Sequence, residues 1–60
     1  MQTMTDYEYI KKYCDNKYSV FSEKSKNFPH TFEQVAFYDR HIWIDEENGI
    51  EIVNEFYVGD

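Results

Sequence analysis

The chain has 60 residues, of which 12 are Asp or Glu against six Lys or Arg, and its formal net charge is −6. This charge disfavours binding to nucleic acid and to anionic lipid, because both are bound through Lys and Arg side chains. The single cysteine excludes an internal disulfide, so one small domain over residues 1–60 has to draw its stability from a dense core, for which the aromatic residues, 20% of the chain, supply the apolar mass.

A helix is predicted from Thr5 to Asn16. Thr5 and Glu8 have the spacing of a capping box, in which each side chain binds the other residue's free backbone N–H. Met4 and Tyr9 stand where a hydrophobic staple has its two residues. We expect the apolar side of this helix to pack in the core, and a tyrosine-rich contact surface is the alternative. That side comprises Tyr7, Tyr9, Ile10, Tyr13, Cys14 and Tyr18.

The middle of the chain has weaker patterns. Residues 17–22 alternate between polar and apolar side chains, which predicts a short strand, and residues 23–30 have the composition of a long exposed loop. Residues 31–38 allow two interpretations. Thr31 and Gln34 have capping-box spacing and favour a short helix, whereas the Phe, Val and Tyr residues of the same segment also suit a strand. The helix is slightly preferred.

The clearest pattern lies near the C-terminal end. An Asn48-Gly49 pair separates two apolar runs, which is the signature of a β-hairpin, and we expect this hairpin to run from Arg40 to Val58. Apolar and polar side chains alternate in the second run, as in a strand with one face on a core. The predicted fold is therefore α+β, with an N-terminal helix packed on a small antiparallel sheet that is built around a C-terminal β-hairpin.

The charges beside the turn predict the register of this hairpin. A two-residue turn would place Glu46 opposite Glu51, and two like charges in that position cost stability. We therefore expect a three-residue loop, residues 47–49, which sets Ile44 opposite Ile52.

Trp43 stands opposite Val53 in this register. Because neighbouring residues of a strand point to opposite faces, Trp43 is directed outward if Ile42 and Ile44 are directed toward the core. It is then either an exposed anchor for a partner, or it is covered by a second layer, such as the short helix or another copy of the chain.

The second half of the chain holds the whole negative charge. Residues 31–60 contain eight acids against Arg40 alone. Three of them crowd the expected hairpin tip, and two more project from the strand on the face away from the core, which makes an acidic edge. Together with two aromatic residues of the outward face, they form the predicted partner-binding set: Asp45, Glu46, Glu47, Glu51, Glu55, Trp43 and Tyr57. The alternative is that these acids only keep a small protein in solution.

No reaction can be assigned from the sequence. Cys14, His30 and His41 have no metal-ligand spacing among them, and Cys14 falls on the apolar side of the first helix, where a buried thiol is ordinary. The acidic loop does not match a calcium-binding loop, because the position that requires Asp holds Ile44. We expect no catalytic residue, no cofactor and no metal.

These observations favour a small acidic binding protein that occludes a basic surface on a larger protein. No stretch has the roughly 18 apolar residues of a membrane span, so we expect a cytoplasmic protein, either of the cell or of an infected host cell. Small phage or mobile-element inhibitors of nucleic-acid-handling enzymes have this general character. The alternative is a structural or accessory subunit that forms a homodimer through its aromatic surface.

Overall fold

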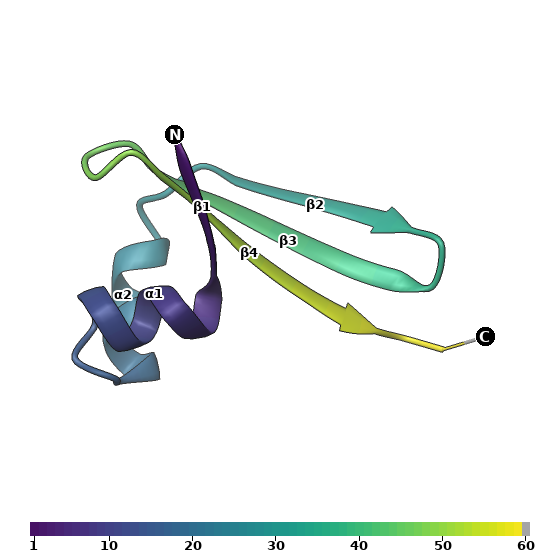
Figure 1. Ribbon diagram of the computed structural model, residues 1–60, viewed down its shortest axis with the longest axis horizontal. Coiled ribbons are helices and arrows are strands. Elements are labelled where there is room, and N and C mark those ends of the chain that lie inside the picture. The colour runs from purple at the N-terminus through teal and green to yellow at the C-terminus, as the bar shows by residue number, and fades with distance from the viewer. Residues whose placement is uncertain (60) are drawn as a thin grey trace.

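The computed structural model describes residues 1–59 and has the predicted α+β fold, with an N-terminal helix on a small sheet (Figure 1). Within these residues two helices and four strands follow one another. They are β1 (Gln2–Thr5), α1 (Asp6–Tyr13), α2 (Tyr18–Ser25), β2 (His30–Val35), β3 (Tyr38–Asp45) and β4 (Ile50–Tyr57).

The strands form one sheet in the order β1-β4-β3-β2. The predicted hairpin is present as the antiparallel pair of β3 and β4, and β2 adds to β3 in the antiparallel direction. β1 was not expected. It pairs with β4 in the parallel direction, so the sheet is mixed and not purely antiparallel.

The start of α1 is the one that the sequence predicts. Thr5 accepts a hydrogen bond from the Glu8 N–H, and the Glu8 carboxylate accepts one from the Thr5 N–H, each at 3.1 Å. The helix ends at Tyr13, and Asp15 and Asn16 then adopt left-handed φ values of 54° and 58°. Asp and Asn tolerate this conformation better than most residues, which explains why the helix ends there.

The prediction of a strand over residues 17–22 is wrong, because this segment forms α2. Its alternating pattern covers too few residues to tell a strand from a helix. In the helix Phe21 turns inward and is 2% exposed, and Val20 packs at the edge of the core.

The preference for a helix over residues 31–38 is also wrong, since β2 and a tight turn occupy this segment. The high strand propensity of Phe32 and Val35 outweighs the capping-box spacing. Ala36 has a φ of 55° in the two-residue turn that joins the paired residues Val35 and Tyr38.

The register of the β3–β4 hairpin differs by one residue from the prediction. Asp45 pairs with Ile50, so the loop has four residues, 46–49, and Trp43 stands opposite Ile52. A four-residue loop also avoids pairing two glutamates, and it lets the Asp45 carboxylate bind the backbone N–H of Asn48. A shift of one residue turns every side chain of a strand to the other face.

The orientation predicted for these side chains is therefore wrong. Trp43 points toward the helices, and Ile42 and Ile44 point away from them. Trp43 shares the face of Ile52, which packs against the helices, and we call this the covered face. Ile42 and Ile44 lie on the opposite face, which we call the open face.

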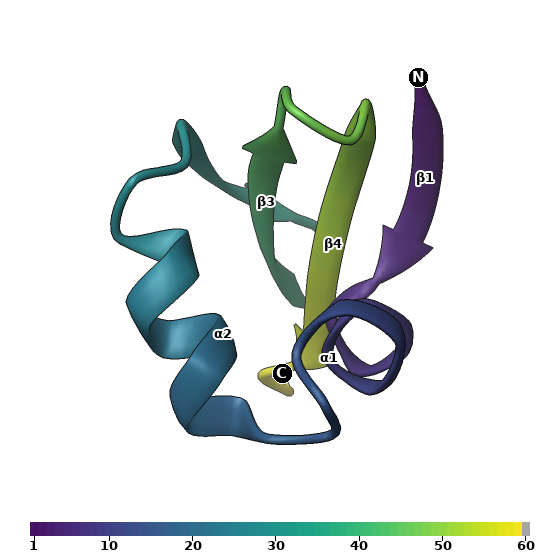
Figure 2. The ribbon, with the colours of Figure 1, turned by 90° about the vertical axis from the view of Figure 1, so that its left-hand side faces the viewer.

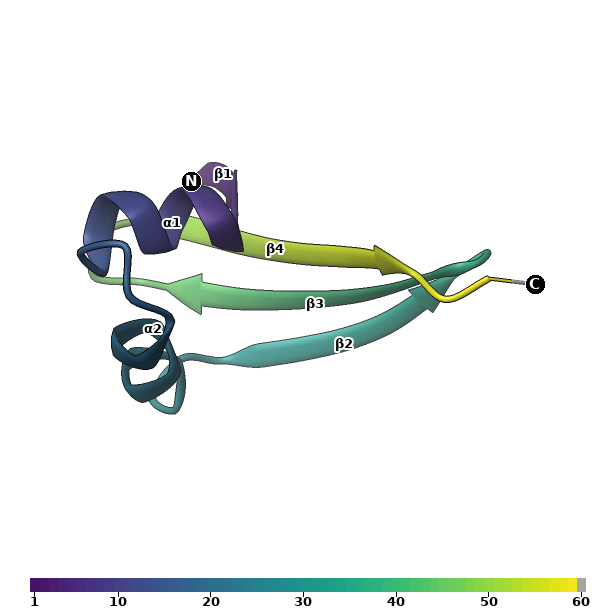
Figure 3. The same ribbon diagram turned by 90° about the horizontal axis from the view of Figure 1, so that it is seen from below.

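The helices cover only one end of the sheet (Figures 1 and 2). The core lies there and consists of Met4, Tyr9, Cys14, Phe21, Ile50 and Ile52. Beyond the helices, β2, β3 and β4 continue as an arm, which we define as residues 32–39 and 55–58 (Figure 3). The molecule is accordingly elongated, at 35 × 21 × 19 Å.

Candidate binding pocket between the helices and the sheet

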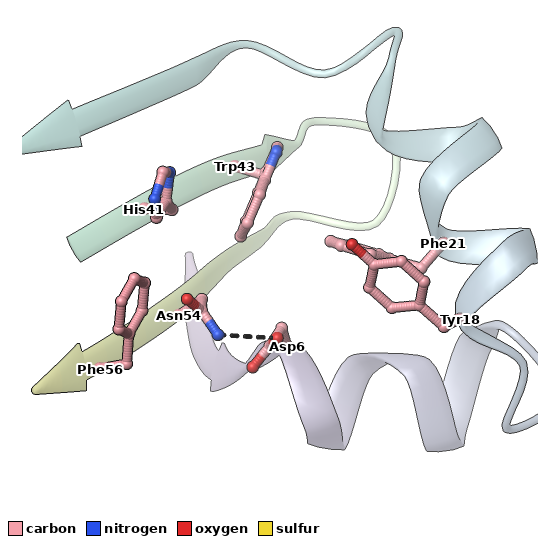
Figure 4. A pocket seen from close by; sticks show the side chains of 7 residues that line it. All are labelled: Asp6, Tyr18, Phe21, His41, Trp43, Asn54 and Phe56. Carbon is pink, nitrogen blue, oxygen red and sulfur yellow. Dashed lines mark hydrogen bonds between the residues drawn. The ribbon is translucent and has the colours of Figure 1, made fainter. Parts of the chain in front are cut away.

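A pocket of about 320 Å³ opens between the helices and the covered face of the sheet. Figure 4 shows that its side chains come from both helices and from the two central strands. The lining consists of Asp6, Tyr18, Phe21, His41, Trp43, Asn54 and Phe56. Its volume is at the lower end of the roughly 300–1,000 Å³ that ligand pockets occupy, so it suits a single side chain better than a cofactor.

The carboxylate of Asp6 belongs to this lining. Asp6 is the first residue of α1, so the capping interactions of Thr5 fix where it stands relative to the sheet. The side-chain amide of Asn54 donates a hydrogen bond of 3.0 Å to Asp6 Oδ2, which Figure 4 shows as a dashed line. This bond joins α1 to β4 and orients the carboxylate beside the pocket.

Aromatic rings form the walls. Trp43 from β3 meets Phe21 from α2 edge to face, with ring centroids 5.2 Å apart. Tyr18 extends the α2 side and its ring centroid is 6.1 Å from that of Phe21. On the sheet side, His41 and Phe56 are nearly parallel at 8°. The contact between Trp43 and Phe21 forms the inner part of the wall, whereas Tyr18 and Phe56 are 69% and 49% exposed.

A second histidine supports the sheet wall from β2. His30 stacks on Trp43 at 5.0 Å, and its Nε2 lies 3.0 Å from Nδ1 of His41. One of these two nitrogens has to carry the hydrogen while the other accepts it. The pair fixes the plane of the His41 ring and ties the edge strand to the pocket.

A buried polar pair lies on the other side of the core. The Tyr9 hydroxyl donates a hydrogen bond of 2.6 Å to Asp45 Oδ2, and both residues are almost fully buried. Asn48 donates two more bonds to the same carboxylate, one from its side chain and one from its backbone. A buried charge needs such donors, because it has lost its water.

These contacts shift two pKa values. Burial by itself would raise the pKa of the Asp45 carboxyl, but the hydrogen bonds from Tyr9 and Asn48 outweigh it and hold the pKa below its ordinary value. Burial, together with the hydrogen bond and the charge of Asp45, raises the pKa of the Tyr9 phenol far above its ordinary value. The pair is therefore a carboxylate and a neutral phenol at neutral pH.

The residues predicted to bind a partner are distributed over different parts of the surface. Glu46 and Glu47 are exposed in the β3–β4 loop. Asp45, which was counted with them, is 2% exposed and bonded as described, so its side chain is not available to a partner in this conformation. Trp43 is on the covered face and lines the pocket, whereas Tyr57 is on the open face and 60% exposed.

The two remaining glutamates of the acidic edge lie on the open face of β4 and have partners of their own. Glu51 accepts a hydrogen bond from the Thr3 hydroxyl at 3.2 Å. Arg40 Nε lies 3.3 Å from the Glu55 carboxylate, and Arg40 Nη1 lies 3.3 Å from that of Glu33. Arg40 therefore offsets part of the negative charge of the open face, and the acids do not form one continuous edge.

The histidines and the cysteine of the chain are in different places. Cys14 is buried at the end of α1, and burial raises the pKa of its thiol. His30 and His41 contact each other on the sheet. Over residues 1–59, no three His, Cys, Asp or Glu side chains gather as metal ligands.

The predicted partner-binding set included only Trp43 among the seven lining residues. The pocket depends on α2, which was predicted as a strand, and on the hairpin register, which was displaced by one residue. One feature of the sequence could have identified Asp6. It follows the capping-box residue Thr5, so its carboxylate has a fixed position in the first turn of the predicted helix.

Comparisons with family models, with curated proteins and with solved structures found no match to this chain. Neither α1 nor α2, the helices found over residues 1–59, is long and apolar enough to cross a membrane.

Proposed function

We propose that this protein is a non-catalytic binding protein that docks on a basic surface of a larger protein and occludes it. One observation supports this proposal above the others: the pocket combines the Asp6 carboxylate with a wall of aromatic rings. We propose that the pocket takes a cationic side chain, Arg or Lys, from the partner's surface.

The chemistry of the pocket favours a cation over other ligands. The faces of Trp, Tyr and Phe rings attract a cation, by about 0.5–2 kcal/mol depending on how well water is excluded. A carboxylate beside them adds the opposite charge and a hydrogen-bond acceptor. The same carboxylate repels a phosphate or a carboxylate ligand, and no Ser, Cys or Lys is among the seven lining residues to act as a nucleophile.

The remaining charge supports docking at longer range. The net charge of −6 attracts a basic surface, and Glu46 and Glu47 stand exposed in a loop at the helix-covered end of the sheet. Basic surfaces are typical of proteins that handle nucleic acid, because they bind phosphates through Lys and Arg. Such a protein is the partner class that we propose, and the effect of binding would be to inhibit it.

A titration with a pair of small probes tests the pocket. N-acetyl-arginine amide is the cationic probe, and N-acetyl-citrulline amide is nearly identical in shape but neutral. We expect the arginine probe to shift the NMR signals of the Trp43 indole and of His41, with millimolar affinity, and the citrulline probe to bind at least about fivefold more weakly.

Two variants act as matched controls for this titration. Asp6→Asn removes the pocket charge, and Asp15→Asn removes the same charge from a site that is 89% exposed just after α1. We expect the arginine probe to lose affinity for Asp6→Asn and to keep it for Asp15→Asn. Equal binding of the two probes to the wild-type protein, or equal losses in the two variants, would contradict the proposal.

A further inference from the structure

The outer edge of β2 is bare. All six residues of this strand are exposed, and β2 is the last strand of the sheet. Figure 3 shows α2 beside the start of β2 and no other element of residues 1–59 along the rest of its outer side. An edge strand in this state presents unpaired backbone groups to any strand that can approach it.

The hydrogen bonds on the inner side identify these unpaired groups. The N–H of Ile44 donates to the carbonyl of Pro29 at 3.0 Å. Bonded and non-bonded pairs alternate along an antiparallel ladder, so Thr31, Glu33 and Val35 direct their backbone groups toward β3. The intervening residues direct theirs outward. They are His30, Phe32 and Gln34.

The edge has none of the usual protections against pairing. Natural edge strands are commonly guarded by Lys, by Pro or by a bulge. The pairing of β2 with β3 is continuous, Pro29 stands before the strand, and all five lysines of the chain fall within residues 11–26. The only charged side chain of β2, Glu33, is 3.3 Å from Arg40. A strand of this kind is available for pairing with a copy of itself whenever two molecules meet.

The arm beside this edge also exposes apolar surface that a second copy can cover in part. Five aromatic side chains there are about half exposed, and two valines accompany them. They are Phe32, Val35, Phe37, Tyr38, Phe56, Tyr57 and Val58. Since a buried aromatic side chain covers about 150–250 Å², the rings alone present on the order of 500 Å² per chain. A standard interface buries about 800 Å² per partner, so the arm supplies part of one. Phe32 and Val35 lie on β2 itself, and the other five lie in the turn, on β3, and on or just after β4.

We propose that two copies of this chain pair through β2, antiparallel and with Phe32 opposite Phe32, to form one continuous eight-stranded sheet. This register pairs all three outward residues of each strand, because His30 of one copy meets Gln34 of the other. It also brings Val35 opposite Pro29 of the second copy. The bare arm of each copy then lies beside the helix-covered end of the other.

Other registers are weaker for two reasons. Only residues with outward backbone groups can bond across the edge, so the strands can shift only in steps of two. A shift toward the C-terminal end sets Glu33 opposite Glu33, two like charges, and requires Ala36, which is in the turn with a φ of 55°, to act as a strand residue. A shift in the other direction sets Thr31 opposite Thr31 and leaves Gln34 opposite Phe28, which lies before Pro29 and outside the strand.

Sedimentation equilibrium between about 1 and 200 μM tests the dimer, with a proline variant to locate it. Gln34→Pro removes an outward N–H and leaves the β2–β3 ladder intact, because proline is tolerated where the N–H of an edge strand faces solvent. Gln34→Ala is the matched control that keeps the N–H. We expect a dimer for the wild-type protein and for Gln34→Ala, and at least about a tenfold weaker one for Gln34→Pro. A wild-type monomer at 200 μM, or equal dimers in all three proteins, would overturn the proposal.

Amide hydrogen exchange identifies which residues of β2 pair across the dimer. At low concentration the amides of Thr31, Glu33 and Val35 should exchange more slowly than those of His30, Phe32 and Gln34. As the dimer forms, we expect the second group to become protected. Protection that does not depend on concentration would exclude pairing at this edge.

A charge at Thr31 tests the same register by affinity. In the proposed dimer Thr31 stands opposite Glu33 of the other copy, twice by symmetry. Thr31→Lys should therefore strengthen the dimer relative to Thr31→Gln, and Thr31→Glu should weaken it, each by roughly 2- to 30-fold. No difference among the three variants would contradict the Phe32 register. Phe56 of the arm lines the pocket, but neither Gln34 nor Thr31 does, so these variants test the dimer separately from the proposed function.

Discussion

The two ends of this sheet differ although they share the same strands. On the covered face of β4, Ile52 is 0% exposed and Phe56, four residues later, is 49% exposed. Both are large apolar side chains in one strand and on one face, and only the first lies under the helices. The difference shows that position relative to the helices, and not residue type, decides which apolar residues form the core. It also shows where surface remains for other molecules.

Alanine substitutions at these two positions should give the largest contrast. Ile52→Ala leaves a cavity in the core and should lower the free energy of unfolding by about 2–5 kcal/mol, which is close to the whole stability of a domain this size. Phe56→Ala should cost less than about 1 kcal/mol, because half of the side chain is already in water. Urea unfolding measures both. Similar losses at the two sites would mean that the arm belongs to the cooperative core.

The Tyr9–Asp45 pair should give the next largest effect. Asp45→Ala leaves the buried Tyr9 hydroxyl without an acceptor and removes the anchor of the β3–β4 loop. We expect a loss of about 1–3 kcal/mol, as is usual for an unsatisfied buried polar group. Glu47→Ala, in the same loop but exposed, is the control and should change the unfolding free energy by less than about 0.5 kcal/mol.

The same pair predicts how stability depends on pH. The pKa of Asp45 is lower in the folded protein than its ordinary value of 3.8, so the unfolded state takes up the proton first as the pH falls. The stabilisation by this group is therefore complete above its ordinary pKa and is lost as the pH falls through the lower folded value. The difference in unfolding free energy between the wild-type protein and Asp45→Asn should shrink over that range. A constant difference would contradict the assignment.

The contrast between the two ends also explains what could be predicted from the sequence. The capping box of Thr5 and Glu8 and the Asn48-Gly49 turn are local signals, and both identified their elements correctly. α2 and β2 carry no comparable local signal. Residues 18–25 become helical because Phe21 packs under the sheet, and this depends on contacts that are distant in the sequence.

The candidate site was harder to predict for a related reason. One residue of hairpin register decides whether Trp43 faces the helices or the solvent, and the charge repulsion used to choose the register excludes only one alternative. The acidity of Asp45, Glu46 and Glu47 is visible in the sequence. That Asp45 is used internally, by Tyr9 and Asn48, depends on the fold.

The turn at the end of the arm offers a smaller effect of opposite sign. Ala36 has a φ of 55°, a conformation that costs a residue with a Cβ about 1 kcal/mol or more and costs glycine little. Ala36→Gly should therefore stabilise the protein by up to about 1 kcal/mol, and Ala36→Val should destabilise it. Thermal unfolding of the three proteins gives the order. Destabilisation by glycine would mean that flexibility gained in the unfolded chain outweighs the relief of strain.

The smallest effect on stability, and the largest on association, should come from reversing charges at the helix-covered end. Glu46→Lys combined with Glu47→Lys changes exposed loop charges, which contribute little to folding, so we expect a change below about 0.5 kcal/mol. An arginine-rich peptide is the probe for association. Its on-rate should fall for this variant, and for the wild-type protein it should fall as added salt shortens the Debye length from about 10 Å at 0.1 M toward 3 Å at 1 M.

A charge-matched variant separates local from overall charge in that experiment. Glu23→Lys, at an exposed position of α2, is compared with Glu47→Lys alone, so that each variant reverses one charge. Glu8 is unsuitable for this purpose, because its carboxylate caps α1 and its loss would disturb the helix. If the β3–β4 loop guides docking, the loop variant should slow association several-fold more than the helical variant. Equal slowing would mean that only net charge matters, and an on-rate that salt does not change would leave the pocket to act without electrostatic guidance.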